Sequence, residues 1–131
     1  MSAPCSSITR YIEWVDTDAS GAHHYTTAFR LAEAAEASLH RDLGITERMF
    51  GRTPRVHVEA DFRRPLQFGD ETTCELCVAE LGRSSIRYRF VVTRGGERCV
   101  EGSVVAAYVG DDGQPARWPD DLRAALRGTG A

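Results

Sequence analysis

The chain has 131 residues, which is enough for one domain with a buried core but short for two. We therefore expect a single domain over residues 1–131, with no large cofactor-binding unit and no cofactor. The 16 basic and 19 acidic residues give a formal net charge of −3. Since no overall positive charge draws in nucleic acid or an anionic membrane, neither is an expected partner.

The hydropathy pattern shows no membrane-spanning segment. No apolar run approaches the roughly 20 residues that a spanning helix needs, and no apolar segment follows a basic region near the N-terminus. We therefore expect a soluble, cytoplasmic protein.

Four cysteines occur, and two of them form the segment "CELC", a spacing found in metal and redox sites. The surrounding run "DETTCELCVAELG" is typical of a strand, in which residues three apart point to opposite faces, so Cys74 and Cys77 would diverge. We therefore expect all four cysteines, Cys5 and Cys99 included, to be reduced and to fill apolar space, with no metal site.

The first expected element is a strand at residues 8–15, "ITRYIEWV", which is rich in β-branched and aromatic residues. After a polar joint, apolar residues recur at spacings of three and four from Thr27 to Leu43. This pattern predicts an amphipathic helix, with Thr26 or Thr27 as its N-cap and Gly44 just past its end. The many alanines of this helix favour close packing against a sheet.

Four further strand-like runs follow a loop at residues 45–54: "RVHVEADF", "TTCELCVAEL", "SSIRYRFVVTR" and "RCVEGSVVAAYV". The segments between them carry the Gly, Pro and Asp residues of turns, and short turns favour antiparallel neighbours. A short helix is expected near "PDDLRAALR". The order predicts an α+β fold, with one helix across a curved antiparallel sheet of about five strands.

Three segments together resemble a known family: "DTDASG" at residues 16–21, "ADFRRPLQFGDE" at 60–71 and "AELGRSSIRYRF" at 79–90. With the order of elements, they resemble the hotdog-fold acyl-CoA thioesterases of the 4-hydroxybenzoyl-CoA thioesterase type, including the Tol-Pal-associated branch. The resemblance implies a sheet wrapped around one long central helix. It also implies a homodimer or homotetramer, in which sheets join edge to edge and each active site draws on both chains.

The resemblance further implies hydrolysis of an acyl thioester, carried by CoA or acyl carrier protein, to a free carboxylic acid. Asp18 matches the family's nucleophile or general base, and the backbone N–H of Tyr25 matches the group that polarises the thioester carbonyl. The residue types agree, since a carboxylate can attack a carbonyl or activate water, and a helix start offers unpaired N–H groups. Gly21 would allow a sharp turn close to substrate. Asp16 is expected to shape the turn.

Glu33 lies about two helical turns past Tyr25 and is a second candidate acid or base; its alternative role is an ordinary solvated or ion-paired position. His23 and His24 are expected at the border of the substrate pocket as substrate-binding residues, and a His–Asp pair like that of hotdog dehydratases is conceivable. The alternative for each is an ordinary structural role, lining a pocket or capping the helix. Neither has an evident third partner for a metal ion.

Phosphate groups of CoA or of a phosphopantetheine arm favour arginine anchors. The expected anchors are the "GRSS" segment with Arg83, Ser84 and Ser85, and a second patch at Arg63 and Arg64. Each could equally be a polar turn.

Two other functions stay open at this point. A hotdog dehydratase or hydratase would act on a β-hydroxyacyl thioester through histidine. A non-catalytic module would bind acyl-CoA without turnover.

Overall fold

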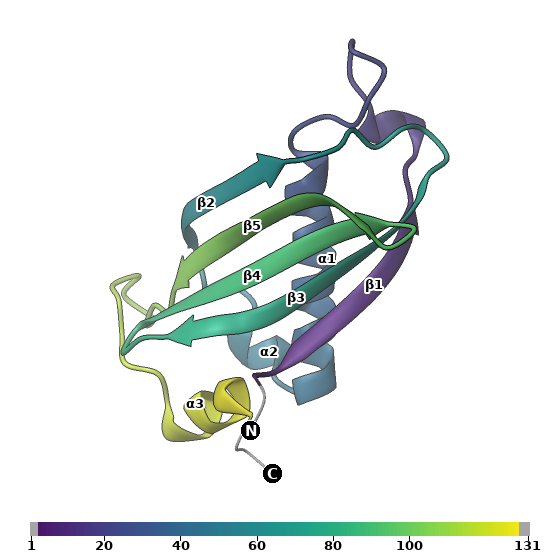
Figure 1. Cartoon of the computed structure of the whole chain (residues 1–131). Coiled ribbons are helices and arrows are strands. Elements are labelled where there is room, and N and C mark those ends of the chain that lie inside the picture. Colours follow the sequence, from purple (N-terminus) through teal and green to yellow (C-terminus); the bar gives the residue numbers. More distant parts are fainter. Residues whose placement is uncertain (1–2, 129–131) are drawn as a thin grey trace.

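A computed structural model describes residues 3–128 (Figure 1). The elements in chain order are β1 (Cys5–Tyr11), the short 3-10 helix η1 (Trp14–Asp16), α1 (Thr27–Leu43), α2 (Thr46–Met49), β2 (Arg55–Phe62), β3 (Glu71–Leu81), β4 (Ser85–Arg94), β5 (Glu97–Ala107) and α3 (Asp120–Arg127). The expected α+β architecture with five antiparallel strands is confirmed.

The strands lie in the order β1-β3-β4-β5-β2, so β2 and β3 are not neighbours. The expectation of pairing between consecutive strands holds for β3–β4 and β4–β5 and is wrong for β2–β3. The eight-residue link at 63–70 leaves β2 at one side of the sheet and returns to β3 beyond β4 and β5 (Figure 1). Leu66 in this link is fully buried, so the crossing segment is anchored in the core.

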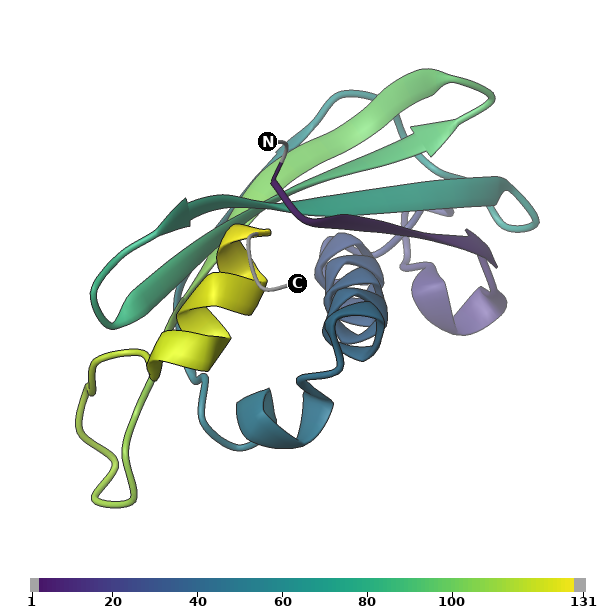
Figure 2. The ribbon, with the colours of Figure 1, turned by 90° about the horizontal axis from the view of Figure 1, so that it is seen from below.

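The helices lie on one face of the sheet, with both α1 and α3 beneath the strands (Figure 2). The bounds of α1 agree with the sequence prediction, and this helix has 17 residues. Ala28, Ala32 and Ala35 are at most 1% exposed, because side chains this small let the helix approach the strands closely. Gly44 ends the helix with a φ of 71°, a left-handed conformation that glycine adopts without strain.

The large side chains on the core side of β4 explain why β5 has a glycine at position 102. Tyr88, Phe90 and Val92 alternate along β4 and are at most 1% exposed. Gly102 pairs with Phe90, and a Cβ at Gly102 would lie 2.2 Å from the carbonyl oxygen of Glu59 and 2.7 Å from the Phe90 ring. The glycine therefore makes room for the ring, which meets Phe29 of α1 edge-on at 6.0 Å between centroids.

Two boundaries differ from the sequence predictions. The first strand covers Cys5–Tyr11 rather than residues 8–15, because residues 13–16 close into a turn in which the Glu13 N–H donates to Asp16 Oδ2 and the Asp16 N–H donates to the Glu13 carbonyl. The expected loop at 45–54 contains the single-turn helix α2. Within residues 3–128 no helix is long and apolar enough to cross a membrane.

The expectation of four reduced cysteines is wrong for two of them. Antiparallel register places Cys5 of β1 directly opposite Cys77 of β3, and the two form a disulfide. Cys74 points to the other face of β3, as expected, and is a buried free thiol; Cys99 is also buried and free. The pairing of Cys5 with Cys77 depends on which strands are neighbours, so the spacing within "CELC" could not predict this disulfide.

Candidate active site

A small cleft lies where the segment before α1 meets the end of β2. Its volume is about 330 Å³, and its lining residues are Asp18, His23, Tyr25, Phe62, Arg63, Arg64 and Pro65. The cleft therefore brings together Asp18 and Tyr25 with one of the two predicted arginine patches and one of the two predicted histidines.

A tight hairpin at residues 17–23 carries Asp18. The Asp18 N–H donates to the Ala22 carbonyl and the Gly21 N–H donates to the Asp18 carbonyl, both at 3.0 Å. Gly21 has a φ of 84°, a region that side-chain-bearing residues rarely adopt. The spacing of Asp18 and Gly21 thus follows from the geometry of the turn, which leaves the aspartate exposed at the cleft.

Ser20 fixes the Asp18 carboxylate. Oδ1 accepts the Ser20 hydroxyl at 2.6 Å and the Ser20 N–H at 2.8 Å, whereas Oδ2 has no hydrogen-bond donor among residues 3–128. These two bonds favour the charged form and hold the pKa of Asp18 below its ordinary value. The group is therefore ionised at neutral pH, with one oxygen oriented and the other open for chemistry.

Tyr25 supplies a backbone donor close to the start of α1. Among the described residues its N–H has no hydrogen-bond acceptor, while the next N–H, that of Thr26, donates to His24 Nδ1 at 3.1 Å. The His24 and Tyr25 rings stack with centroids 4.6 Å apart. His24 thus satisfies an N–H at the helix start, and the unpaired Tyr25 N–H is placed where the helix dipole favours negative charge.

Asp16 has structural contacts instead. Its Oδ2 accepts the Glu13 N–H, and its Oδ1 forms an ion pair with Arg30 at 2.6 Å. Its carbonyl accepts the His24 N–H and the Thr27 hydroxyl. Asp16 therefore holds the joint to the first turn of α1.

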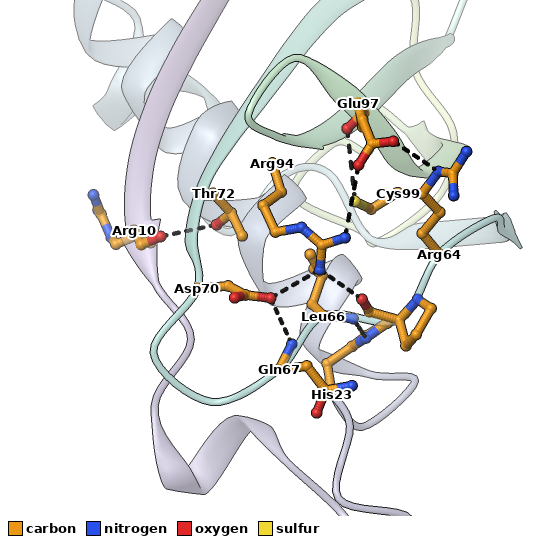
Figure 3. Close-up of polar contacts among 11 residues, drawn as sticks. Arg10, His23, Arg64, Leu66, Gln67, Asp70, Thr72, Arg94, Glu97 and Cys99 are labelled. Atoms are coloured by element: carbon orange, nitrogen blue, oxygen red, sulfur yellow. Dashed lines mark hydrogen bonds and ion pairs between the residues drawn. The ribbon is translucent and has the colours of Figure 1, made fainter.

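His23 is joined to the link between β2 and β3 by two hydrogen bonds (Figure 3). Its N–H donates to the Leu66 carbonyl at 2.8 Å, and its Nδ1 accepts the Leu66 N–H at 3.0 Å. Burial lowers the pKa of His23, so its imidazole is neutral at neutral pH. The Phe62 ring lies against it, with centroids 5.7 Å apart.

Arg94 holds the same link from the opposite side (Figure 3). Its Nη1 donates to the Pro65 carbonyl and to Asp70 Oδ2, each at 2.9 Å, and Asp70 Oδ2 also accepts the Gln67 N–H at 2.8 Å. The end of β4 is thereby connected through the link to His23 and the hairpin of Asp18.

Arg63 and Arg64 lie at the rim of the small cleft with their side chains 56% exposed. Each has an acidic neighbour on β5: Arg63 Nη2 lies 3.2 Å from Glu101, and Arg64 Nε lies 3.5 Å from Glu97. The two cations are thus oriented and still open to an anionic ligand.

The "GRSS" segment and Glu33 do not join this cleft within one chain. Arg83 and Ser84 lie in the turn between β3 and β4, and Ser85 begins β4, at the other end of β3 from the hairpin. The Arg83 and Ser85 carbonyls accept the two N–H groups of Trp118. Glu33 is exposed on α1 and borders a larger cleft.

That larger cleft has a volume of about 770 Å³ and lies between the second half of α1 and the segment that leads into β2. Its lining residues are Glu33, Glu36, Ala37, His40, Thr46, Met49, Phe50, Gly51, Thr53, Pro54, Arg55, Val109 and Gly113. Arg55 forms an ion pair with the buried Glu36, and His40 Nε2 lies 2.9 Å from the Tyr88 hydroxyl. The buried side chains of Glu36 and His40 thus line this cleft together with apolar groups such as Met49 and Phe50.

Comparison with known proteins places the chain in a family. A family model described as the Thioesterase-like superfamily matches residues 11–126. The chain belongs to this superfamily. The expected resemblance to hotdog acyl-CoA thioesterases is confirmed, and so is the expectation of an enzyme, a thioesterase.

Several curated relatives of this thioesterase-like protein share one name, 1,4-dihydroxy-2-naphthoyl-CoA hydrolase. The protein of Acaryochloris marina is 34% identical over 100 residues, which cover 70% of this chain and 72% of that one. The protein of Prochlorococcus marinus strain MIT 9303 is 35% identical over 96 residues, or 63% of each chain, so less than two thirds of that relative is matched.

Solved structures agree with the fold. A thioesterase from Thermus thermophilus, crystallised with coenzyme A and Zn, has a TM-score of 0.87 at 25% identity and covers 98% of this chain and 95% of its own. A 1,4-dihydroxy-2-naphthoyl-CoA thioesterase from Synechocystis has a TM-score of 0.81 at 16% identity, with coverage of 93% and 95%.

Sequence reasoning missed the residues that connect the site to the rest of the molecule. Leu66 and Arg94 lie 43 and 71 positions beyond His23; Leu66 falls within the quoted segment at 60–71 without a chemical role being evident there, and Arg94 lies outside all three quoted segments. In the sequence Glu36 is one of several charged residues of the helix, although in the structure it is buried and forms an ion pair with Arg55. The only available signal was the position of Glu36 next to Ala35 on the apolar side of the helix.

Proposed function

We propose that this protein hydrolyses an acyl-CoA thioester to a free carboxylic acid and CoA. One observation carries the proposal: the small cleft gathers an ionised carboxylate on Asp18, an unpaired backbone N–H on Tyr25 and two exposed arginines. Thioester hydrolysis needs a nucleophile or base, a donor for the carbonyl oxygen and a hold on the anionic carrier. These groups supply all three.

Two routes start from Asp18 Oδ2. In the first, Oδ2 attacks the thioester carbon, the C–S bond breaks, CoA leaves as thiolate and water then hydrolyses the mixed anhydride. In the second, Oδ2 takes a proton from water as the water oxygen attacks the same carbon, and the C–S bond of the resulting tetrahedral intermediate then breaks, which releases the free acid and CoA as thiolate. In both, negative charge develops on the carbonyl oxygen, and the Tyr25 N–H at the positive end of α1 stabilises it.

The proposed substrate carries an aromatic acyl group on CoA. The names of the curated relatives, which specify a dihydroxynaphthoyl-CoA, support this class. Arg63 and Arg64, at the rim, suit the phosphates of CoA.

The larger cleft is the proposed acyl site, and it requires a second chain. Tyr25 precedes α1, and Glu36 lies nine residues past Thr27, about 14 Å along the helix, which is too far for one aryl group to span from the Tyr25 N–H. The edge strand β2 exposes Val56, Val58 and Phe62 at 62, 47 and 48%. Two β2 strands paired about a twofold axis would run antiparallel, and the larger cleft of one chain would adjoin the small cleft of the other.

This arrangement makes a homodimer the smallest active unit, and a homotetramer would repeat it. It would bring Glu33 beside the Asp18 of a second chain, and the "GRSS" turn would lie toward the same side as that chain's small cleft. The dimer therefore accounts for the expected site residues that one chain leaves apart.

A substrate panel tests the proposal. Purified protein is mixed with benzoyl-CoA, 1,4-dihydroxy-2-naphthoyl-CoA, acetyl-CoA, palmitoyl-CoA and a 3-hydroxyacyl-CoA, and free CoA is measured with a thiol reagent. Release of thiol, fastest from the aromatic substrates, is the expected result. Loss of water from the 3-hydroxyacyl-CoA without thiol release would identify a dehydratase instead. Thermal stabilisation by acyl-CoA without any turnover would identify a binding module.

A further inference from the structure

His23 contains an unpaired hydrogen-bonding atom inside the candidate active site. Its Nε2 is the one buried side-chain nitrogen or oxygen without a hydrogen-bond partner in the described part of the chain. The residue is only 9% exposed and lines the same cleft as Asp18 and Tyr25. Buried polar side chains nearly always have partners, so an unpaired one inside a cleft points to a bound group.

The position of the proton on His23 follows from its other nitrogen. Nδ1 accepts the Leu66 N–H at 3.0 Å, so the proton of the neutral ring must be on Nε2 (Figure 3). The backbone of His23 is held as well, because its N–H donates to the Leu66 carbonyl. The ring is therefore fixed by the fold, and its free group is a donor.

We propose that His23 is a catalytic residue whose Nε2–H donates a hydrogen bond to the carbonyl oxygen of the bound thioester. It is a second donor beside the Tyr25 N–H, and the inference rests on the proposed thioester hydrolysis. When oxygen attacks the thioester carbon, the π electrons of the C=O bond move onto the carbonyl oxygen. Two donors then share that charge, and the pair re-forms the C=O bond as the thiolate leaves.

His23 keeps its proton throughout this step. Burial favours the neutral ring, and a neutral imidazole is a poor acid, so it stabilises the oxyanion through a hydrogen bond and transfers nothing. The neighbouring Phe62 ring packs against the imidazole but is itself 48% exposed at the sheet edge. A ligand that displaces this ring gains access to Nε2.

Two substitutions separate the proposed donor of His23, Nε2–H, from its structural acceptor, Nδ1, which binds the Leu66 N–H. In His23→Asn, the amide oxygen can take the place of Nδ1 and accept the Leu66 N–H, but no donor reaches the Nε2 position. In His23→Gln, the longer side chain can place an amide N–H near the Nε2 position, but it offers no acceptor at the Nδ1 position. Both variants keep the backbone hydrogen bond from His23 to Leu66.

The test measures kcat, KM and Tm for both variants on the best acyl-CoA of the panel. We expect His23→Asn to keep a Tm near that of the wild type while kcat falls on the order of 10²-fold and KM changes little, as for loss of one oxyanion donor. His23→Gln should have the lower Tm of the two and yet recover at least tenfold of the lost kcat.

Other patterns would overturn the inference. If His23→Asn turns over like the wild type, or if kcat simply follows Tm through both variants, His23 is a packing residue. A wild-type protein that releases no thiol from any acyl-CoA would refute the proposed function itself. That outcome is distinct, because it is seen before any variant is made.

Discussion

His23 and Leu66 pair through both backbone and side chain: the His23 N–H donates to the Leu66 carbonyl at 2.8 Å, and the Leu66 N–H donates to His23 Nδ1 at 3.0 Å. This pairing attaches the hairpin that carries Asp18 to the link that crosses from β2 to β3. Because Leu66 is fully buried, the position of the candidate catalytic carboxylate is fixed by the core.

Arg94 should affect turnover although it lies outside the small cleft. Its hydrogen bonds to the Pro65 carbonyl and Asp70 hold the link to which His23 is attached. We expect Arg94→Met to lower kcat by roughly tenfold, because small displacements of reacting groups are costly. Arg98→Met is the matched control, since Arg98 lies on β5, its side chain pairs only with Glu101 among residues 3–128, and it is 69% exposed. Equal kcat values for the two variants would rule out this role for Arg94.

Ser20 should set the acid limit of the activity. Its hydroxyl is the largest cause of the lowered pKa of Asp18, whose ionised form is the one that the proposed mechanism uses. Activity is therefore lost as pH falls through that pKa, and Ser20→Ala, which raises the pKa, should move the acid limb of the kcat/KM profile to higher pH. The plateau at neutral pH should stay close to that of the wild type. An acid limb that does not move would show that another group controls it.

His40 should make folding stability depend on pH. Burial, followed by the charge of Arg55, lowers the pKa of His40 from 6.5 to about 4. Between these values the unfolded chain binds more protons, so stability is full above about pH 6.5 and falls as the pH drops toward 4. The loss attributable to His40 amounts to about 3 kcal/mol at pH 4.

Urea denaturation of the wild type and His40→Gln between pH 4 and 7 measures this loss. The glutamine can still reach the Tyr88 hydroxyl, and the variant should show a smaller fall in unfolding free energy across the range. His57→Gln, at an exposed position on β2, is the control. Parallel curves for the wild type and His40→Gln would contradict the assignment.

The disulfide between Cys5 and Cys77 should contribute to stability. It joins residues 72 positions apart, and the chain-entropy model assigns a loop of that length about 4 kcal/mol. We expect the Cys5→Ser, Cys77→Ser double variant to lose about 2–4 kcal/mol of unfolding free energy without loss of kcat. Thiol titration of the unfolded, unreduced protein should find only Cys74 and Cys99. A titration that finds all four thiols would exclude the bond.

Local patterns predicted the parts of this fold that depend on neighbouring residues. The bounds of α1 follow from a 3.6-residue apolar period and Gly44, and β2 follows from the run "RVHVEADF" between Pro54 and Arg63. The position of β2 beside β5 and the pairing of Cys5 with Cys77 depend on which distant strands meet, and no local pattern encodes that.

The candidate site divides in the same way. The turn that carries Asp18 and Gly21 is encoded by a short local motif, "DTDASG", so this part of the site could be predicted from the residues and the family resemblance. The bonds of His23 to Leu66 and of Arg94 to Pro65 join segments that only the folded chain brings together. The same holds for the burial of Glu36, which depends on Arg55 of β2.

The most direct test of this account is the kcat of Asp18→Asn on an aromatic acyl-CoA that the wild type hydrolyses, with Asp16→Asn alongside. The asparagine keeps an oxygen that can accept both Ser20 hydrogen bonds but is neither a base nor a nucleophile. We predict that kcat falls on the order of 10²-fold or more with little change in substrate Kd. Asp16→Asn should mainly lower stability, through its contacts with Arg30 and Glu13. Full turnover by Asp18→Asn, together with loss of turnover in Asp16→Asn or Glu33→Gln, would contradict the account.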